Sequence, residues 1–563
     1  MANTASAPEV PPAVARPARV RAVLWLASLV WVLPLWLIRY LPMVDYPQQL
    51  AVASILRYYN DPSRMLRQAY EPALLRPQGL FEMITAGLAW LMPIEQAGKV
   101  VLALSLALVV PAAVALCRRT GRPDWYALFA LAVTYNHAFY WGFADNLLAY
   151  PVVLAGGALA DRLFDRPRFG WREWLPLAAC TLLFYGIHLQ FMLVFAGLAG
   201  WLAIARRPGW KRLAAWLSAL VPGLAAGMGV LAWIHLHAAE VMTAYQERIQ
   251  ATQPYYLPLQ QKISNLPKDC FGEFIGGTHF LLMTILMLAV LALAVPFSRS
   301  DSRPPARSDG RPADLLYRSR FLVPALGLFA LYFILPEFAS GYFVAQRILV
   351  LAFMLAVPAL PVPPSAVRKR VAALLLGGLL IVQAGQTSAS FLSFGAETAG
   401  LEELLAATEP GQALAGLMYP KIVTDYPWPP VLTQFPAYYQ VEKGGRIHFS
   451  FVQFFNSPVR YRPGQNWEDG LLAEWDEWSP QKFSYPRHGR YFRYFLLRGD
   501  PEHLSTAFGP YLASVRVRSA GRWFLVERLP GAQPVEGAPP PGAAQPVPQQ
   551  DAERPFGPVR EPG

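Results

Sequence analysis

Long apolar runs separated by short polar stretches dominate the first 390 residues of the chain. A membrane-spanning helix needs about 20 mainly apolar residues. Runs that approach or exceed this length lie near 22–41, 99–117, 124–142, 145–163, 174–190, 191–206, 213–237, 280–297, 321–336, 345–362 and 371–386. The pattern therefore predicts a polytopic α-helical membrane protein with about eleven transmembrane helices.

For two of the apolar stretches, the number of membrane crossings does not follow from length alone. The run 79–93 is short and contains Glu82, and a charged side chain is costly at the centre of a bilayer. We expect this run to be a core or interfacial segment that does not span. The stretch 174–206 forms either two short spans that turn near His188 or one long span.

The charge distribution gives the orientation. Charged residues make up only 15% of the chain, against about 25% in soluble domains. The net charge is +12, but the Lys and Arg residues cluster in short segments between the apolar runs, as in cytoplasmic loops. This clustering argues against nucleic acid as a partner. It puts the N-terminus inside, and a large first loop, 42–98, outside.

The chain changes character after the last apolar run. Residues 1–20 are rich in Ala, Pro and Arg and are expected to be a disordered cytoplasmic N-terminus, followed by a transmembrane domain over 21–390. The pattern of helix, turn and strand from 401 to 419 predicts a soluble α/β domain over 391–529 on the outer face. Residues 530–563, rich in Pro and Gly, are expected to be disordered.

Further strands of this C-terminal domain are expected at 447–455, 491–497 and 523–527. The three cysteines show neither a disulfide framework nor zinc-ligand spacing.

Polar residues that could carry chemistry gather at the outer ends of the predicted spans. Asp45 lies just beyond the first span, where a carboxylate can act as a general base or bind a metal. His188 interrupts an apolar run, where a polar group is costly. Asn146 lies close to Trp141, and its amide could hydrogen-bond a sugar or cap the next span. No metal-ligand spacing is present, so a divalent metal beside Asp45 stays possible without being assigned.

Two short motifs resemble those of the GT-C superfamily, the membrane glycosyltransferases that use polyprenyl-phosphate-linked sugars. The stretch Asp45-Tyr46-Pro47-Gln48-Gln49-Leu50-Ala51 is similar to the D-x-P-x-H-x-A pattern of bacterial members, with Gln49 at the position of the His. The stretch from Phe139 to Asn146 resembles an aromatic W-G-F segment closed by Asn. The first span, the acidic residue and the large outer loop also follow that architecture over roughly 22–390.

The resemblance implies a function and roles for individual residues. Asp45 would be the base that takes a proton from the acceptor hydroxyl. Arg347 and Lys99, each at the outer end of a span, would stabilise the donor phosphate, a role that suits a guanidinium. His188, Trp141 and Asn146 would complete the substrate site. Snorkelling of helix-end cations to the lipid headgroups is the alternative for Arg347 and Lys99.

The expected reaction is transfer of a sugar from a polyprenyl-phosphate donor to a lipid, glycan or protein acceptor at the outer face of the bacterial inner membrane, with membrane lipids as further partners. Two other functions stay open. A transporter or flippase would need ionisable residues near the span centres or matched broken helices. A non-catalytic assembly protein of envelope glycan pathways would leave Asp45 and Arg347 dispensable.

Overall fold

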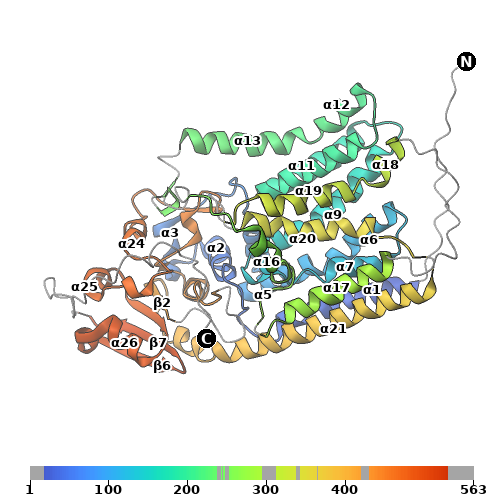
Figure 1. Cartoon of the computed structure of the whole chain (residues 1–563). Helices are drawn as coiled ribbons and strands as arrows, with labels where there is room; N and C mark the ends of the chain where they lie inside the picture. Colours follow the sequence, from blue (N-terminus) through green and yellow to red (C-terminus); the bar gives the residue numbers. More distant parts are fainter. Residues whose placement is uncertain are drawn as a thin grey trace, which may run out of the picture.

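The protein is a bundle of long helices with a mixed sheet region at one end (Figure 1). This computed structural model describes residues 18–237, 242–243, 245–247, 253–274, 276–294, 312–337, 343–363, 365–419 and 430–530. The predicted disordered segments 1–20 and 530–563 lie outside the described residues, except for 18–20 and Pro530.

The bundle accounts for most of the predicted apolar runs. Its helices are α1 (Ala18–Trp31), α5 (Ile94–Ala107), α6 (Val109–Arg119), α7 (Ala127–Leu131), α9 (Ala144–Phe164), α10 (Trp171–Ile187), α11 (Leu189–Ile204), α12 (Trp210–Ser218), α13 (Val221–Leu236), α17 (Thr278–Ala294), α18 (Pro312–Arg318), α19 (Leu322–Ile334), α20 (Val344–Ala356) and α21 (Ala366–Glu397).

Several of these helices have the length and composition of membrane spans. Among the described residues, three are long and apolar enough to cross a membrane: Ile94–Arg119, Ala144–Phe164 and Ala366–Glu397. A fourth is added if α12 and α13, bent by 55°, count as one span. Five shorter apolar helices of 10–17 residues accompany them. The number of eleven spans stays a prediction.

The run 124–142 differs from its prediction as one span. It forms a 3₁₀ turn at Asp124–Tyr126, the short helix α7 and the four-residue helix α8 (His137–Tyr140), with irregular backbone between α7 and α8. Polar side chains satisfy the interrupted backbone, because the Asn136 amide donates to the Val133 carbonyl and its oxygen caps α8 at the Phe139 N–H. The whole run is buried or nearly so, which explains its apolar composition.

The stretch 174–206 forms two helices, and His188 is the break between α10 and α11. The backbone of His188 is extended, with φ −169° and ψ 124°, so it ends one helix and begins the next. Its Nδ1 lies 3.2 Å from the Gln190 N–H and caps α11. The break places the imidazole where α10 ends and α11 begins.

The first outer loop is structured. It contains α2 (Tyr46–Tyr58), α3 (Leu66–Ala69), strand β1 (Tyr70–Pro72) and α4 (Leu80–Leu88), separated by a 3₁₀ turn at Pro62–Arg64. Helix α4 has nine residues. It is therefore about 13.5 Å long, much shorter than the hydrocarbon core of about 30 Å. Glu82 on α4 is buried.

The C-terminal region contains a five-stranded mixed sheet in the order β3-β2-β5-β7-β6. Its strands are β2 (Ala413–Met418), β3 (Arg446–Ile447), β5 (Tyr494–Arg498), β6 (Val515–Ala520) and β7 (Trp523–Arg528). Its helices are α22 (Leu401–Ala406), α23 (Ala437–Lys443), α24 (Glu468–Glu474), α25 (Tyr485–His488) and α26 (Pro501–Phe508). Strand β2 runs parallel to β3 and β5, whereas β7 is antiparallel to β5 and β6.

The predicted strand 447–455 is wrong beyond its first residue. Only Arg446–Ile447 form β3, and Phe451–Gln453 form a 3₁₀ turn, because the Ser450 side chain accepts a hydrogen bond from the Val452 N–H and turns the chain. Strand β6 has no counterpart in the sequence-based expectation. Its arginines Arg516 and Arg518 alternate with valines, and four of its six residues are exposed, so the segment lacks the apolar run expected of a buried strand.

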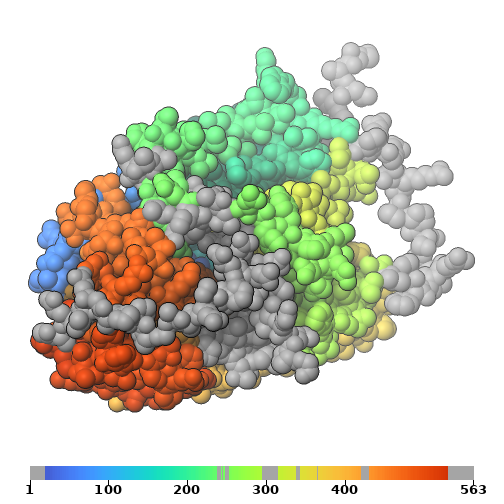
Figure 2. Space-filling view, turned by 60° about the vertical axis from the view of Figure 1, so that its left-hand side comes forward, coloured from blue at the N-terminus to red at the C-terminus, as the bar shows by residue number. Residues whose placement is uncertain are grey.

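The C-terminal region and the first outer loop pack as one unit. Strand β1 pairs antiparallel with β4 (Val459–Tyr461), and the Gln440 amide on α23 donates to the Tyr70 hydroxyl at 2.9 Å. Arg39, after the first helix, contacts Glu95 at 3.0 Å and Glu442 at 2.9 Å. Figure 2 shows first-loop residues (blue) beside C-terminal residues (orange) at one end of the molecule.

Helix α21 connects the bundle to the sheet. Its 32 residues extend over about 48 Å, more than the hydrocarbon core of about 30 Å. Its C-terminal end is held by the sheet, because the Trp523 indole N–H donates to the Glu397 carbonyl at 2.9 Å and Arg498 pairs with the Glu397 carboxylate. The C-terminal region thus sits at the opposite end of α21 from the basic residues Arg368–Arg370.

We expect alkaline phosphatase fused after Gly400, just beyond α21, to be active in a bacterial host, and a fusion near residue 305 to be inactive. The reason is that the basic segments then share the inner side. Phosphatase activity of whole cells, normalised to fusion abundance, measures this. The reverse pattern would contradict the orientation.

Candidate functional site

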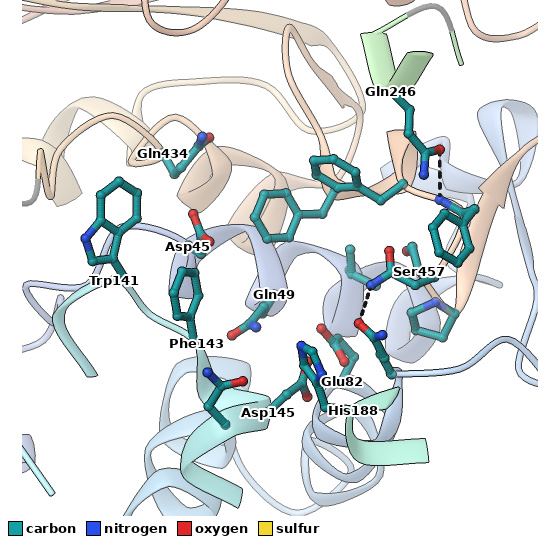
Figure 3. A pocket seen from close by; sticks show the side chains of 18 of the residues that line it. Asp45, Gln49, Glu82, Trp141, Phe143, Asp145, His188, Gln246, Gln434 and Ser457 are labelled. Carbon is teal, nitrogen blue, oxygen red and sulfur yellow. Dashed lines mark hydrogen bonds between the residues drawn. The ribbon is translucent and has the colours of Figure 1, made fainter. Parts of the chain in front are cut away.

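A cavity of about 380 Å³ lies where the bundle helices meet the first loop and the C-terminal region. Three parts of the chain supply its polar and aromatic lining. Asp45, Gln49, Val52, Gln78 and Glu82 come from the first loop; Trp141, Phe143, Asp145, Asn146, His188, Gln190, Val344 and Arg347 come from the bundle; Gln434, Phe449, Phe451, Phe454–Pro458, Glu477 and Trp478 come from the C-terminal region, with Tyr245 and Gln246 between them. Figure 3 shows this lining from close by.

Asp45 is held by its backbone, which leaves its side chain to the cavity. Its N–H donates to the Trp141 carbonyl at 2.9 Å, and the Val44 N–H donates to the Tyr140 carbonyl at 3.0 Å. Asp45 is also the N-cap residue of α2, yet its carboxylate makes no capping hydrogen bond. The carboxylate is therefore available to a ligand.

The segment at Asp45 can approach the segment at Trp141 this closely only because residue 142 is glycine. The residue has φ +80°, and a Cβ built there would lie 2.6 Å from the Tyr46 nitrogen and 2.7 Å from the Asp45 nitrogen. Both neighbours are backbone atoms, so no side chain can move aside. The W-G-F segment thus determines where Asp45 stands.

Arg347 extends from the first turn of α20 into the same cavity. Its guanidinium lies 3.8 Å from the centre of the Phe143 ring, and Nη1 lies 2.8 Å from His188 Nε2. Its Nε has no hydrogen-bond partner among the described residues. Because its hydrogen-bonded partner is an imidazole and not a carboxylate, the Arg347 guanidinium can bind an anion.

The Asp45 carboxyl and the Arg347 guanidinium interact electrostatically. Burial raises the pKa of the Asp45 carboxyl to about 7, and the charge of Arg347 opposes that rise. A carboxyl with a pKa near 7 is half ionised at neutral pH and accepts a proton more readily than an ordinary aspartate.

Two further carboxylates line the cavity, Glu82 on α4 and Asp145 at the start of α9. They interact electrostatically with each other, and burial raises the pKa of Glu82 to about 8. Glu82 Oε2 and Asp145 Oδ1 have no hydrogen-bond partner among the described residues. Figure 3 shows both side chains beside His188. In the sequence, Glu82 argues against membrane spanning by 79–93, and a buried acid in an apolar helix is also a sign of a polar site.

The structure brings five of the six candidate residues together and leaves out the sixth. Asp45, Arg347, His188, Trp141 and Asn146 all line the cavity. Lys99 does not line it, because its ammonium donates to the Ile38 carbonyl and lies 6.0 Å from the centre of the Trp36 ring.

Asn146 and Gln49 offer unused polar atoms to the cavity. Both amide atoms of Asn146 and Oε1 of Gln49 are buried without a hydrogen-bond partner in the described part of the chain. Gln49 occupies the place where the GT-C pattern carries His, and it does line the cavity. Buried polar atoms that lack a protein partner are suited to hold a ligand.

Among the described residues, no group of three or more His, Cys, Asp or Glu side chains is arranged to hold a metal ion.

No family model and no curated protein matches the chain. The structure is similar to two crystal structures of ArnT from Cupriavidus metallidurans. The one bound to undecaprenyl phosphate has 13% identity and a TM-score of 0.49 over 92% of this chain and 99% of the other. The apo state has 14% identity and a TM-score of 0.49 over 90% and 98%.

The chain is also similar to the Archaeoglobus fulgidus oligosaccharyltransferase tethered with an acceptor peptide, with 12% identity and a TM-score of 0.38 over 92% of this chain and 74% of the other. ArnT and this oligosaccharyltransferase are GT-C proteins, members of the superfamily that the motif around Asp45 resembles.

Proposed function

We propose that the protein is a GT-C-type glycosyltransferase that moves a sugar from a polyprenyl-phosphate donor to an acceptor hydroxyl. The observation that supports this most directly is the shared cavity of Asp45 and Arg347, a partly ionised carboxyl and a guanidinium with an unused donor. Glycosyl transfer from a phosphate needs both kinds of group. The reaction would take place at the outer face of a bacterial inner membrane.

The residues divide the reaction between them. The acceptor hydroxyl attacks the anomeric carbon, and its proton passes to the Asp45 carboxylate, since a hydroxyl is a weak nucleophile until its proton is removed. The bond between the anomeric carbon and the phosphate oxygen breaks, and the oxygen keeps the electron pair. The polyprenyl phosphate leaves with its added negative charge beside Arg347. The resemblance implies inversion at the anomeric carbon.

The cavity also supports roles for its other polar residues. The neutral His188 imidazole lies against Arg347 and orients the guanidinium. The Asn146 amide can hydrogen-bond hydroxyls of the transferred sugar, and Trp141 provides an aromatic face next to Phe143, with ring centres 6.1 Å apart.

We expect the rate of transfer to rise with pH up to about pH 7 and then level off. The base must be ionised, and the Asp45 pKa is about 7, so the rate should fall roughly tenfold per pH unit below that value. A pH–rate profile of kcat/KM with purified protein in nanodiscs measures this. A flat profile between pH 5 and 8 would contradict the role of Asp45.

Replacing Arg347 by Ala should weaken binding of the donor phosphate by roughly 10–100-fold, because a charge-assisted hydrogen bond contributes about 1.5–3 kcal/mol. Arg347→Lys should recover part of the loss, since Lys keeps the charge without the planar fork. The measurement is the Kd for polyprenyl phosphate.

Lys99→Ala serves as the control for that measurement, because Lys99 is a cation in the second turn of α5 and does not line the cavity. Equal weakening by Lys99→Ala and Arg347→Ala would point to an effect of overall charge. Full donor binding and turnover in Arg347→Ala would favour the non-catalytic assembly protein instead.

A further inference from the structure

The cavity has a second end, formed by the C-terminal region. Tyr245, Phe449, Phe451 and Phe454 make an aromatic wall there, with ring centres 5.2 Å apart for Tyr245 and Phe449, 6.0 Å for Phe449 and Phe451, and 5.3 Å for Phe451 and Phe454. Tyr245 and Phe449 are buried, whereas Phe451 and Phe454 are partly exposed. The wall therefore presents ring surface to the cavity.

Amide side chains border this aromatic wall. Gln246 accepts from the Phe455 N–H at 3.3 Å, and Asn456 donates to the Gln78 oxygen at 2.8 Å, as the dashed lines of Figure 3 show. Gln434 accepts from Gln48 at 2.9 Å. Ring faces flanked by amides suit a molecule with apolar faces and a hydroxylated edge.

The charges of the cavity limit what this molecule can be. Arg347 is the one Lys or Arg among the described lining residues, whereas Asp45, Glu82, Asp145 and Glu477 are acids. Among the described lining residues, a donor phosphate bound at Arg347 leaves no second Lys or Arg for another anion. An acceptor with its own phosphate or carboxylate would face acids without a counter-charge.

The wall is tied to the helix that carries Asp45. The Gln48 amide nitrogen donates to the Gln434 oxygen and to the Phe449 carbonyl, each at 2.9 Å, and its oxygen accepts from the Phe451 N–H at 3.2 Å. Gln48 lies three residues after Asp45 and is buried. A molecule stacked on the wall would therefore stand at a defined distance from the Asp45 carboxylate.

We propose that the aromatic wall is the acceptor subsite and takes an uncharged sugar, whose ring stacks on Phe451 or Phe454 while one hydroxyl faces Asp45. This rests on the proposed glycosyltransferase function and adds the chemical class of the acceptor. The acceptor is thus a neutral glycan or glycolipid headgroup. A phosphorylated or uronic acid acceptor is disfavoured.

Soluble probes test the charge preference on the full chain in nanodiscs loaded with polyprenyl phosphate. The probes are p-nitrophenyl glucoside, galactoside and mannoside, compared with p-nitrophenyl glucuronide, and binding is followed by calorimetry. At least one neutral glycoside should bind at least tenfold more tightly than the glucuronide. Equal or tighter binding of the glucuronide, or no binding of any neutral glycoside at millimolar concentration, would overturn the proposal.

Variants test the location of the subsite. Phe451→Ala should raise the Kd of the neutral glycoside by roughly 5–100-fold, if the ring stacks as strongly as a nucleic-acid base on an aromatic side chain, about 1–3 kcal/mol. Phe451→Tyr should keep the affinity within a few-fold. Tyr256→Ala is the control, because Tyr256 is an outer aromatic residue that is 58% exposed and does not line the cavity.

Donor binding separates this proposal from the proposed function. Phe451→Ala should leave the Kd for polyprenyl phosphate unchanged, since Arg347 is intact. An unchanged glycoside Kd in Phe451→Ala, with donor binding and turnover retained, would overturn the subsite and leave the glycosyltransferase standing. If Phe451→Ala does not fold, the selectivity of the unaltered protein between glucoside and glucuronide decides.

Discussion

Asp45→Asn should lower the rate of sugar transfer by roughly 10²–10⁴-fold, the contribution of a well-placed general base. Asn has the same size and keeps the backbone hydrogen bond to Trp141, but it cannot accept the hydroxyl proton. Donor binding should change little, because the phosphate is expected at Arg347. The measurement is turnover of a polyprenyl-phosphate sugar by protein quantified in membranes.

The stability of the same variant separates catalysis from structure. The Asp45 carboxyl has an ordinary pKa of 3.8 and a raised pKa of about 7 in the folded chain, so the folded state binds its proton more tightly than the unfolded state. Stability from this group is present below pH 3.8 and is lost as pH rises through about 7. Asp45→Asn should therefore unfold at the same or a higher temperature at pH 8, despite its loss of activity.

Asp61→Asn is the matched control for this substitution. Asp61 also lies in the first outer loop and begins a helical turn, with its carboxylate accepting from the Ser63 N–H at 3.0 Å. Asn caps such a turn equally well, and Asp61 does not line the cavity. Full activity in Asp45→Asn, or equal losses in both variants, would reject Asp45 as the base.

The sequence predicts the parts of the site that depend on topology. The sequence predicts that Asp45 and Arg347 share a surface, because each lies at the predicted outer end of an apolar run and helices that cross one membrane bring such ends together. That reasoning holds for His188, Trp141 and Asn146 as well. It fails for Lys99, because location at a surface does not tell which way a side chain points, and this one turns to the Ile38 carbonyl.

The remaining parts of the fold and of the site depend on tertiary contacts, which a local sequence pattern does not predict. The domain boundary near 390 falls inside α21, and the C-terminal region packs onto the first loop through β1 and β4. The aromatic wall and the hydrogen bonds that tie it to Gln48 depend on that packing, because Gln48 and Phe451 are 403 residues apart in the sequence. The apolar composition of 124–142 reflects burial. The hydrogen bonds of Asn136 that mark the interruption between α7 and α8 are visible only in the structure.

Gly142→Ala should reduce transfer by roughly 10²-fold or more, although residue 142 touches no substrate in the proposed reaction. The new Cβ would overlap the backbone nitrogens of Asp45 and Tyr46, so the Asp45 segment has to move away from Trp141. A displacement of about 1 Å between reacting groups costs on the order of 10²-fold in rate. Turnover and the donor Kd, both measured on the inserted protein, show whether the loss lies in the reaction step.

The control for Gly142→Ala is Gly121→Ala, which separates the clash from the backbone strain. Gly121 has φ +69°, close to the +80° of Gly142, but nothing lies within 4 Å of a Cβ built there. Each variant carries the left-handed penalty of about 1–2 kcal/mol, and only Gly142→Ala displaces Asp45. We therefore expect Gly121→Ala to lose some thermal stability and keep its turnover. If Gly142→Ala were as active as Gly121→Ala, the contact between the W-G-F segment and Asp45 would not be what positions the base.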